Sequence, residues 1–302
     1  MANTRFVAWG ELLWDLFPDR SRLGGASANA AYHATCLGAR ATLVSRIGND
    51  GLGARALDEL GRVGVDTQAI QLDARAPTGT VEVTLIAGEP HYEIASGVAW
   101  DQLSWTEALT PTFAEADVVS FGTLAQRGPR GFDALKQALS RVQQDAIRFC
   151  DLNLREPFVS YELVAQALSL ATVVKLNEAE LARLEQLFGQ SDLISWLLNE
   201  RGIELVALTR GARGAVLVTA HERYEHPGVA LSSSNGDAVG AGDAFGAALT
   251  LNLAQGLTLP ECLAHANRYA AHVASHAGGM PAPPPWVPGR ALSVRGQHAE
   301  AR

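Results

Sequence analysis

Hydrophobic and polar positions along the chain follow two periods that alternate almost from end to end. Short apolar runs rich in Val, Ile and Leu are typical of buried strands, and the segments between them carry apolar residues at helical spacing. The predicted strands are 6–13, 42–47, 118–121, 147–152, 173–176, 205–208 and 215–218. The predicted helices are 28–37, 51–63, 131–143, 163–171, 178–188, 193–200, 243–254 and 261–275. This alternation predicts an α/β fold with a mostly parallel central sheet covered by helices.

The segment 69–96 breaks this alternation, because it contains strand patterns alone, with turn residues at 78–79 and 88–90. We expect these strands to form a small β lid beside the main sheet, built mainly by 69–98 with a contribution from about 11–20. The alternative is an extra antiparallel edge on the main sheet itself. In either case the whole chain, 1–302, is expected to form a single domain.

Composition narrows the class of protein further. With 47% hydrophobic and 19% charged residues, the 302-residue chain is not disordered or fibrous and can bury a core without disulfides or metal. Its 24 basic and 32 acidic residues give a net charge of -8 and leave no basic surplus, which argues against nucleic acid as a partner. Three cysteines without CxxC spacing favour a reducing compartment.

Two apolar stretches raise the question of a targeting or membrane segment. Near the start, Glu11 and Asp15 interrupt any signal-peptide core, and no small-residue cleavage site follows. The charge-free stretch between Ala244 and Glu261 contains polar residues and Pro260, and it is shorter than the ~20 residues of a membrane span. We therefore expect a cytoplasmic protein that has no membrane partner.

The motif DAVGAGDAF at 237–245 directly precedes a predicted apolar helix. Its small residues Gly240, Ala241 and Gly242 let the backbone turn tightly and approach a ligand, and the helix start offers free N–H groups. Backbone amides and the helix dipole together favour an anion at such a place. The motif therefore predicts a phosphate site that these three residues help to form.

Asp243 lies in the first turn of that helix, where its carboxylate would repel a bound phosphate. A purely binding site has no use for this charge, whereas a base that removes a proton from an attacking hydroxyl requires it. The alternative is that Asp243 only caps the helix. A dinucleotide-binding loop fits less well, because the spacing is GxGxxxG and the motif comes late in the chain.

The number and positions of the lysines argue against other classes of phosphate-transferring enzyme. The chain has two, Lys136 and Lys175, and neither follows a GxxxxG run, so there is no Walker A loop. The HRD and DFG segments of protein kinases are absent as well. A kinase of this kind has to use amides, arginines and a metal in place of a lysine that grips the phosphates.

The motifs resemble those of the PfkB, or ribokinase-like, carbohydrate kinase family. The C-terminal family signature matches 237–245, and the N-terminal one matches GGASANAA at 24–31 followed by Leu37-Gly38. Three further segments occur in the expected order between them: GNDG at 48–51, NEAE at 177–180 and TRGARG at 209–214. The resemblance extends from about residue 5 to residue 285.

Within the family the chain most resembles bacterial fructokinases. The segments that carry this likeness are GELLWD at 10–15, PTGTV at 77–81, AWD at 99–101, FGTLAQR at 121–127 and DLNLR at 151–155. The resemblance implies a ribokinase-like three-layer sandwich with a β lid that closes over the sugar. It also implies transfer of phosphate from ATP, with Mg²⁺, to O6 of fructose. The alternatives are ribose or 2-keto-3-deoxygluconate as substrate, and a sugar- or nucleotide-binding regulator without turnover.

The resemblance also assigns residues to the sugar: Asp15, Gly24, Gly25, Asn29, Arg155 and Trp100. Asp15 would accept hydrogen bonds from sugar hydroxyls, and the Asn29 amide can both donate and accept. Arg155 would stabilise phosphate charge or steady the sugar, although it could equally be a surface residue. Trp100 would cover the sugar ring, with packing at a hinge as the alternative.

A second group is assigned by the resemblance to the nucleotide and its metal: Asn177, Glu180, Thr209, Gly211, Gly214 and Asn267. Asn177 and Glu180 share a face at a helix start and would look toward Mg²⁺ and its waters, or else be ordinary helix-surface residues. The residues at 209–214 resemble a nucleotide loop but fit a hairpin turn equally well. Asn267 matches a position near adenine.

Asp237 is the remaining charged residue of the C-terminal signature. In relatives this carboxylate and nearby carbonyls bind K⁺, where an Asp-Thr pair stands in place of Asp237-Ala238. Because Ala238 lacks the hydroxyl, we expect K⁺ activation to be present but weak. A strand-rich lid would also expose sheet edges, so we expect a homodimer that pairs through the lid.

Overall fold

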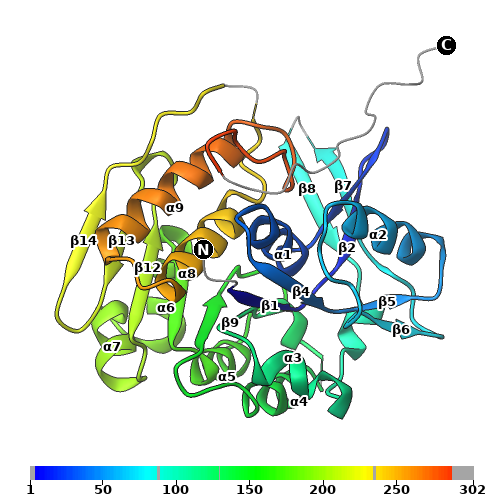
Figure 1. Cartoon of the computed structure of the whole chain (residues 1–302), viewed down its shortest axis with the longest axis horizontal. Helices are drawn as coiled ribbons and strands as arrows, with labels where there is room; N and C mark the ends of the chain where they lie inside the picture. The colour runs from blue at the N-terminus through cyan, green and yellow to red at the C-terminus, as the bar shows by residue number, and fades with distance from the viewer. Residues whose placement is uncertain (1–3, 87–88, 129, 234–235, 288–302) are drawn as a thin grey trace.

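An eight-stranded sheet forms the centre of the computed structural model, which describes residues 4–86, 89–128, 130–233 and 236–287 (Figure 1). The strands lie in the order β14-β13-β12-β11-β10-β9-β1-β4. Their bounds are β1 (Arg5–Trp9), β4 (Arg40–Val44), β9 (Val118–Gly122), β10 (Ile147–Asp151), β11 (Val173–Asn177), β12 (Leu205–Thr209), β13 (Ala215–Val218) and β14 (Arg223–His226). The strands from β4 to β12 pair in parallel, and β13 and β14 continue the sheet antiparallel.

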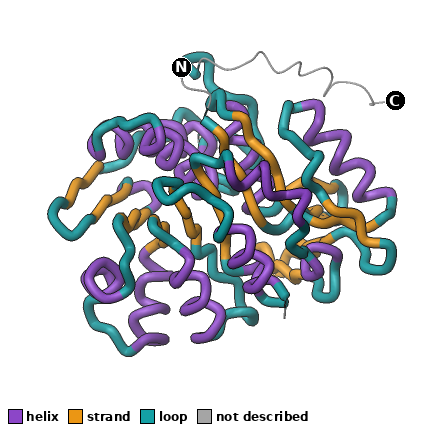
Figure 2. The backbone as a smooth tube through the Cα atoms, turned by 60° about the horizontal axis from the view of Figure 1, so that its bottom comes forward, coloured by secondary structure: helices purple, strands orange, loops and turns teal. Residues whose placement is uncertain are grey.

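Helices cover both faces of this sheet (Figure 2). They are α1 (Ala26–Cys36), α2 (Gly51–Arg62), α3 (Thr110–Ala114), α4 (Gly131–Leu139), α5 (Tyr161–Leu170), α6 (Glu178–Phe188), α7 (Leu193–Glu200), α8 (Ala241–Ala254) and α9 (Leu259–Ala274). Successive side chains of β1 point to opposite faces of the sheet, as the pleat of a strand requires. Phe6 and Ala8 pack in the core cluster that contains α1, whereas Val7 and Trp9 pack with residues of α4 and α5. The predicted α/β fold with a mostly parallel sheet is confirmed.

A separate four-stranded sheet, called the small sheet below, has the order β3-β2-β7-β8. Its strands are β2 (Leu13–Leu16), β3 (Ser21–Gly24), β7 (Gly79–Ile86) and β8 (Glu89–Ile94). β7 and β8 form an antiparallel hairpin that stands beside the main sheet (Figure 1), and residues 87–88 between them lie outside the described residues. The described strands therefore form a sheet of their own. At the start of the segment, β6 (Gln71–Asp73) pairs instead with β5 (Arg46–Gly48).

Two predicted strands are each divided in the structure. The segment 6–13 ends its first strand at Trp9 and resumes as β2 at Leu13, in the other sheet. Gly10 allows the chain to leave the main sheet after Trp9, because its φ is +154° and a Cβ there would lie 2.1 Å from Ser27 Oγ. The segment 42–47 likewise becomes β4 and β5. Apolar residues lie on both sides of each break, and the charged residues near the breaks, Glu11 and Arg46, do not by themselves show that the chain changes sheet.

The helix α8 contains most of the apolar stretch that raised the question of a membrane segment. Its residues 244–251 are buried, and it packs against α1, α9 and β10. Its uniform hydrophobicity is therefore that of a helix enclosed by a protein core. Within the described ranges, no helix has the length and apolar run that a membrane crossing requires.

Candidate active site

The first turn of α8 lies at the edge of the main sheet where β9 and β10 end. Gly122 at the end of β9, Asp151 at the end of β10 and Asp243 line one small pocket of about 10 Å³, which is roughly the space of one water. Gly240 caps the helix with a φ of +75°, and a Cβ there would lie 2.6 Å from Gly279. The turn at 240–242 therefore has the tight backbone that the sequence predicted.

Asp243 is held by a residue far away in the chain. Its Oδ2 accepts a hydrogen bond of 2.8 Å from Nδ2 of Asn29, which lies on α1 and is buried. No side chain caps the start of α8, so the carboxylate of Asp243 does not have the simple capping role. Desolvation and the nearby Asp151 raise the pKa of Asp243 to about 7, although Asn29 and Lys175 oppose the shift. A carboxyl with a pKa near neutrality is suited to accept a proton at physiological pH.

A buried ion pair lies directly behind the glycine turn. Lys175 Nζ donates to both carboxylate oxygens of Asp151, at 2.8 and 2.9 Å, and both side chains are at most 9% exposed. A Cβ placed on Gly242 would lie 3.2 Å from Lys175 Nζ. Burial opposes the charge, but Asp151 and Glu180 raise the pKa of Lys175 above its usual value, so the ammonium stays charged. The chain therefore does place a lysine near the predicted phosphate site, on a strand of the sheet.

Four of the six residues predicted for sugar binding, Asp15, Gly24, Gly25 and Asn29, lie along β2, β3 and the start of α1. Burial raises the pKa of Asp15 to about 6, and Arg155 and Arg22 limit the increase. A Cβ on Gly24 would lie 2.9 Å from Asp15 Oδ2, so the absence of a side chain keeps the carboxylate accessible. Gly25 then caps α1, which carries Asn29 to Asp243. The start of α1 thus connects this segment to Asp243.

Arg155 and Trp100 occupy different environments. Arg155 is close enough to lower the pKa values of both Asp15 and Glu11, which places its charge beside the predicted sugar site. Trp100 is 1% exposed, and the guanidinium of Arg127 lies 4.1 Å from the centre of its ring. This position corresponds to the hinge-packing alternative for Trp100, because the ring is buried in a cluster with Val98 and Leu124 and is already covered.

Asn177 and Glu180 form a reciprocal cap at the start of α6. Glu180 Oε2 accepts from the Asn177 N–H at 2.8 Å, and Asn177 Oδ1 accepts from the Glu180 N–H at 2.9 Å. The other oxygen of Glu180 accepts from the N–H of Leu154 at 2.9 Å. Glu180 is 8% exposed, so it is not the ordinary surface residue of the alternative interpretation. Backbone contacts orient it at the edge of the sheet.

The residues predicted for the nucleotide lie next to this cap. Thr209 at the end of β12 pairs in register with Asn177 at the end of β11. The segment 209–214 joins β12 to β13 as a hairpin, and the Arg210 N–H donates to the Gly214 carbonyl at 2.8 Å. Gly211 lies in the short 3-10 turn of this hairpin. Asn267 on α9 is buried and donates to the Leu263 carbonyl of its own helix at 2.8 Å, so its described contact is structural.

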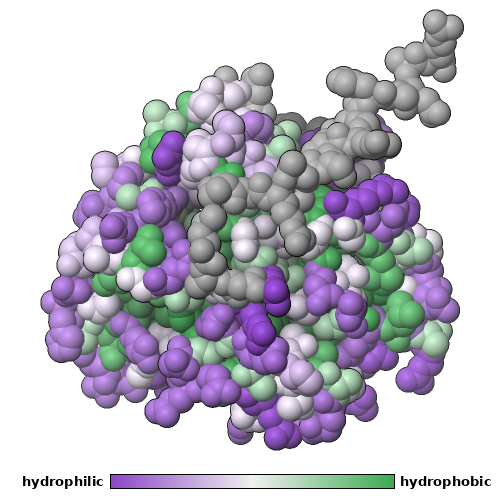
Figure 3. Space-filling view, viewed as in Figure 1, coloured by the Kyte–Doolittle hydropathy of each residue, from purple (hydrophilic) through white to green (hydrophobic). Residues whose placement is uncertain are grey.

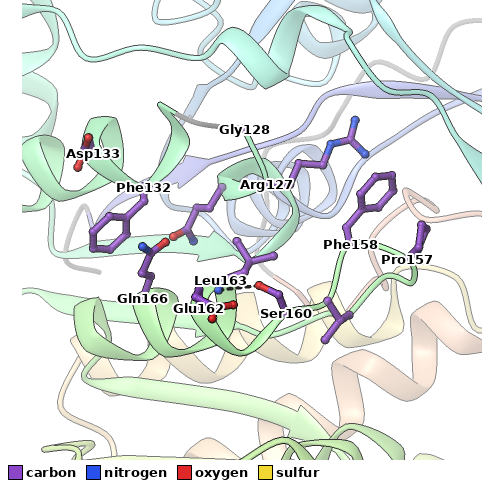
Figure 4. A pocket seen from close by; sticks show the side chains of 12 residues that line it. Arg127, Gly128, Phe132, Asp133, Pro157, Phe158, Ser160, Glu162, Leu163 and Gln166 are labelled. Atoms are coloured by element: carbon purple, nitrogen blue, oxygen red, sulfur yellow. Dashed lines mark hydrogen bonds between the residues drawn. The ribbon is translucent and has the colours of Figure 1, made fainter.

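A larger cavity of about 450 Å³ lies elsewhere, between α4 and α5 (Figure 4). In Figure 4, Phe132 and Asp133 lie on one side of it and Phe158 and Pro157 on the other, with Ser160 between. None of the residues predicted from the sequence lines this cavity. The chemistry-bearing residues therefore gather at the start of α8 and not in this cavity.

The tight glycine turn at a helix start, a near-neutral carboxyl beside it and the sheet edge around it define a phosphate-transferring enzyme of the α/β class. The chain belongs to the pfkB family of carbohydrate kinases, whose sequence profile matches residues 17–286. The expected family is confirmed.

Individual relatives agree with this assignment. A fructokinase of Klebsiella pneumoniae is 30% identical over 271 residues, which cover 83% of this chain and 85% of that protein. The crystal structure of an uncharacterized sugar kinase of Pyrococcus horikoshii matches with a TM-score of 0.81 and 27% identity, covering 92% of this chain and 94% of that one. A fructokinase of Vibrio cholerae, solved with fructose, ADP and calcium, matches with a TM-score of 0.77 and 25% identity over 93% and 96% of the two chains.

These findings confirm the ribokinase-like fold and the class of enzyme. The chain is a sugar kinase, a phosphotransferase with an alcohol group as acceptor. The Pyrococcus sugar kinase has also been solved with ATP, at a TM-score of 0.78. The sequence motifs led directly to Asp243 and Asn29. They did not lead to the Lys175–Asp151 pair, although Asp151 begins the segment DLNLR and Lys175 is a charged residue within an apolar strand.

Proposed function

We propose that the protein is a fructokinase that transfers the γ-phosphate of ATP to O6 of fructose. The observation that carries this proposal is the hydrogen bond between Asn29 and Asp243, because it joins the sugar-contacting motif to the predicted base. The fructokinases of Klebsiella pneumoniae and Escherichia coli, at 30% and 29% identity, support fructose as the substrate.

The proposed reaction is an in-line transfer in which the protein positions the groups. Asp15 and Asn29 hold the sugar hydroxyls, and Asp243 removes the proton of the attacking hydroxyl. The N–H groups of 240–243 stabilise the charge that spreads over the transferring phosphate. The small sheet acts as a lid over the sugar and excludes water that would otherwise hydrolyse ATP.

Carboxylates around the site are suited to Mg²⁺ that arrives with the nucleotide. Asp151 interacts electrostatically with Glu11, Glu180 and Asp243, and buried Oε2 of Glu11 has no hydrogen-bond partner among the described residues. The described residues contain no group of three or more His, Cys, Asp or Glu side chains arranged to hold a metal. Glu180 and Asn177, which the resemblance assigns to the metal, would hold Mg²⁺ through its waters, and the ion would supply charge neutralisation at the phosphates. A ribokinase II of E. coli has been solved with ATP and Mg²⁺.

A coupled assay for ADP release tests the choice of sugar. We expect fructose to give a kcat/KM at least about tenfold above that of ribose or 2-keto-3-deoxygluconate, because each unpaired polar contact costs about 1–3 kcal/mol. Phosphorus NMR of the product should show fructose 6-phosphate. A higher kcat/KM for another sugar would identify the substrate alternative, and no ADP release with any sugar would favour the regulator.

We further propose that the enzyme is a homodimer that pairs through the small sheet. Its outer strands β3 and β8 each have one partner, and Tyr92 on β8 is 51% exposed. On the face shown in Figure 3, hydrophilic and hydrophobic residues are interspersed. Open sheet edges such as those of β3 and β8 are surfaces that proteins usually cover. Light scattering at micromolar concentration should give twice the mass of the 32.0 kDa chain. A mass of one chain would contradict the proposal.

The cysteines support a location in the cytoplasm, which we propose for the enzyme. Cys36, Cys150 and Cys262 are all free and buried. Unpaired thiols of this kind are stable in a reducing compartment.

A further inference from the structure

Arg22 links the small sheet to the loops that surround the start of α8. It lies on β3, and its Nη1 donates to Asp237 Oδ2 at 3.1 Å. The two side chains are 32% and 38% exposed. Arg22 also lies against the loop that follows α9, since a Cβ on Gly278 in that loop would be 3.4 Å from its Nη1. The guanidinium of Arg22 therefore contacts two segments, at Asp237 and at Gly278, that are each more than 200 residues away from Arg22 in the sequence.

The carboxylate of Asp237 is surrounded by hydrogen-bond donors. The Gly278 N–H lies 3.0 Å from both oxygens, and the Val239 N–H donates to Oδ1 at 3.2 Å. Arg22 is the second donor to Oδ2, beside the Gly278 N–H. Each oxygen thus has two donors directed at it, which is as many as its lone pairs ordinarily accept.

This environment does not fit the K⁺ that the sequence resemblance led us to expect. A monovalent cation binds to oxygen lone pairs, and here the lone pairs of Asp237 face N–H groups whose partial charge is positive. A guanidinium already supplies the formal positive charge at this carboxylate. A nearby carbonyl, that of Ala238, also accepts a hydrogen bond, from the Ala241 N–H at 3.2 Å.

The loop that Arg22 contacts leads directly to the proposed base. Gly279, next to Gly278, lies against both Asn29 and Gly240: a Cβ on Gly279 would lie 2.8 Å from Asn29 Oδ1, and a Cβ on Gly240 would lie 2.6 Å from Gly279. Asn29 in turn donates to Asp243. A shift of this loop would therefore displace both the glycine turn and the partner of the base.

Arg22 is also connected to the proposed sugar site through the small sheet itself. In the β2–β3 ladder it is the partner of Asp15, and its charge lowers the pKa of that carboxylate. The same side chain thus influences the sugar-binding carboxylate and the loop at the phosphate end.

We propose that Arg22 is the built-in cation of the Asp237 site: its guanidinium takes the place of a bound monovalent ion and fastens the small sheet to the loops around the start of α8. Arg22 acts through these loops and is a positioning residue. The enzyme consequently works without K⁺. The proposal rests on the sugar kinase activity of the family and not on the identity of the sugar.

The test compares kcat/KM in K⁺ with that in tetramethylammonium at equal ionic strength, using any sugar that the enzyme phosphorylates. The wild type and Arg22→Lys, which keeps the charge, should give a ratio near one. Arg22→Met should have lower activity in tetramethylammonium and a ratio of about three to five, because a partly exposed charge pair contributes up to about 1 kcal/mol. The variant Arg22→Met/Asp237→Asn should lose this response to K⁺.

Arg20 offers a matched control. Its guanidinium is 49% exposed, and the contacts described for it are an ion pair with Asp19 and stacking on Phe17. Arg20→Met should therefore leave the ratio near one. Thermal unfolding without substrates gives a second measurement: K⁺ should raise the midpoint of Arg22→Met but not that of the wild type. An Arg22→Met variant that behaves like Arg20→Met in both measurements, or K⁺ activation of the wild type above about threefold, would overturn the proposal.

Discussion

Replacing Asp243 with asparagine is expected to lower kcat by about 10²–10⁴-fold or more while ATP affinity stays nearly unchanged. Asparagine has the same shape as aspartate and can still accept from Asn29, which donates to Asp243 at 2.8 Å in the wild type. It cannot take a proton from the sugar hydroxyl. Steady-state kinetics with the best sugar of the panel, together with calorimetric titration of ATP, measures both quantities.

Asp192 provides the matched control for a capping role. It begins α7 and its Oδ1 accepts from the Ser195 N–H at 3.1 Å, so it is an aspartate that does cap a helix. Asp192→Asn should keep the wild-type kcat. If Asp243→Asn retained more than about a tenth of kcat, the assignment of Asp243 as the base would be wrong.

The same variant has a pH signature. Desolvation and Asp151 place the pKa of Asp243 at about 7. A general base works only when deprotonated, so kcat/KM of the wild type should fall as pH decreases below about 7, by up to about tenfold per unit, and level off above it. Asp243→Asn should lose this dependence, because it has no proton to bind at that position. If kcat/KM of Asp243→Asn still fell below about pH 7 as in the wild type, the group that titrates there would not be Asp243.

Much of the site follows from local sequence signals because their physical causes are local. A run of small residues followed by an apolar helix predicts the turn at 240–242 wherever it occurs in a fold, and the structure has it. The alternation of apolar runs and helical segments likewise predicts the α/β architecture. The contact between Asn29 and Asp243 is different, since 214 residues separate them and the sequence analysis assigned a role to each without predicting that they meet.

The contacts that the sequence did not indicate depend on tertiary burial. A single lysine within the strand VVKLN looks like an exposed position until neighbouring strands place it 2.8 Å from Asp151. Trp100 has a covered ring because Arg127, from another loop, stacks on it. Arg22 reaches Asp237 only because the small sheet lies beside the start of α8. None of these contacts has a periodicity or a spacing that a sequence pattern could show.

Lys175→Met is expected to reduce both stability and activity near neutral pH. It leaves the 7%-exposed Asp151 without its partner, and breaking a buried ion pair by removing one member costs about 3–5 kcal/mol of unfolding free energy. The double variant Lys175→Met/Asp151→Asn removes both charges and should recover a large part of that stability. Chemical denaturation of the two variants and the wild type measures the difference. Lys136, the other lysine of the chain, is exposed on α4, so Lys136→Met is the matched control and should behave like the wild type.

The pH profile separates an electrostatic role of this pair from a purely structural one. Lys175 lowers the pKa of Asp243, whereas Asp151 raises it. Loss of Lys175 should therefore move the acidic limb of kcat/KM to higher pH by about one unit, and Asp151→Asn should move it to lower pH, because charges this close interact by more than about 1.4 kcal/mol at the effective dielectric of a protein. The double variant should lie between the two. Misfolding or loosened packing alone would reduce activity without moving the limb in opposite directions. If both single variants kept the wild-type limb, the pair would not set the proton affinity of the base.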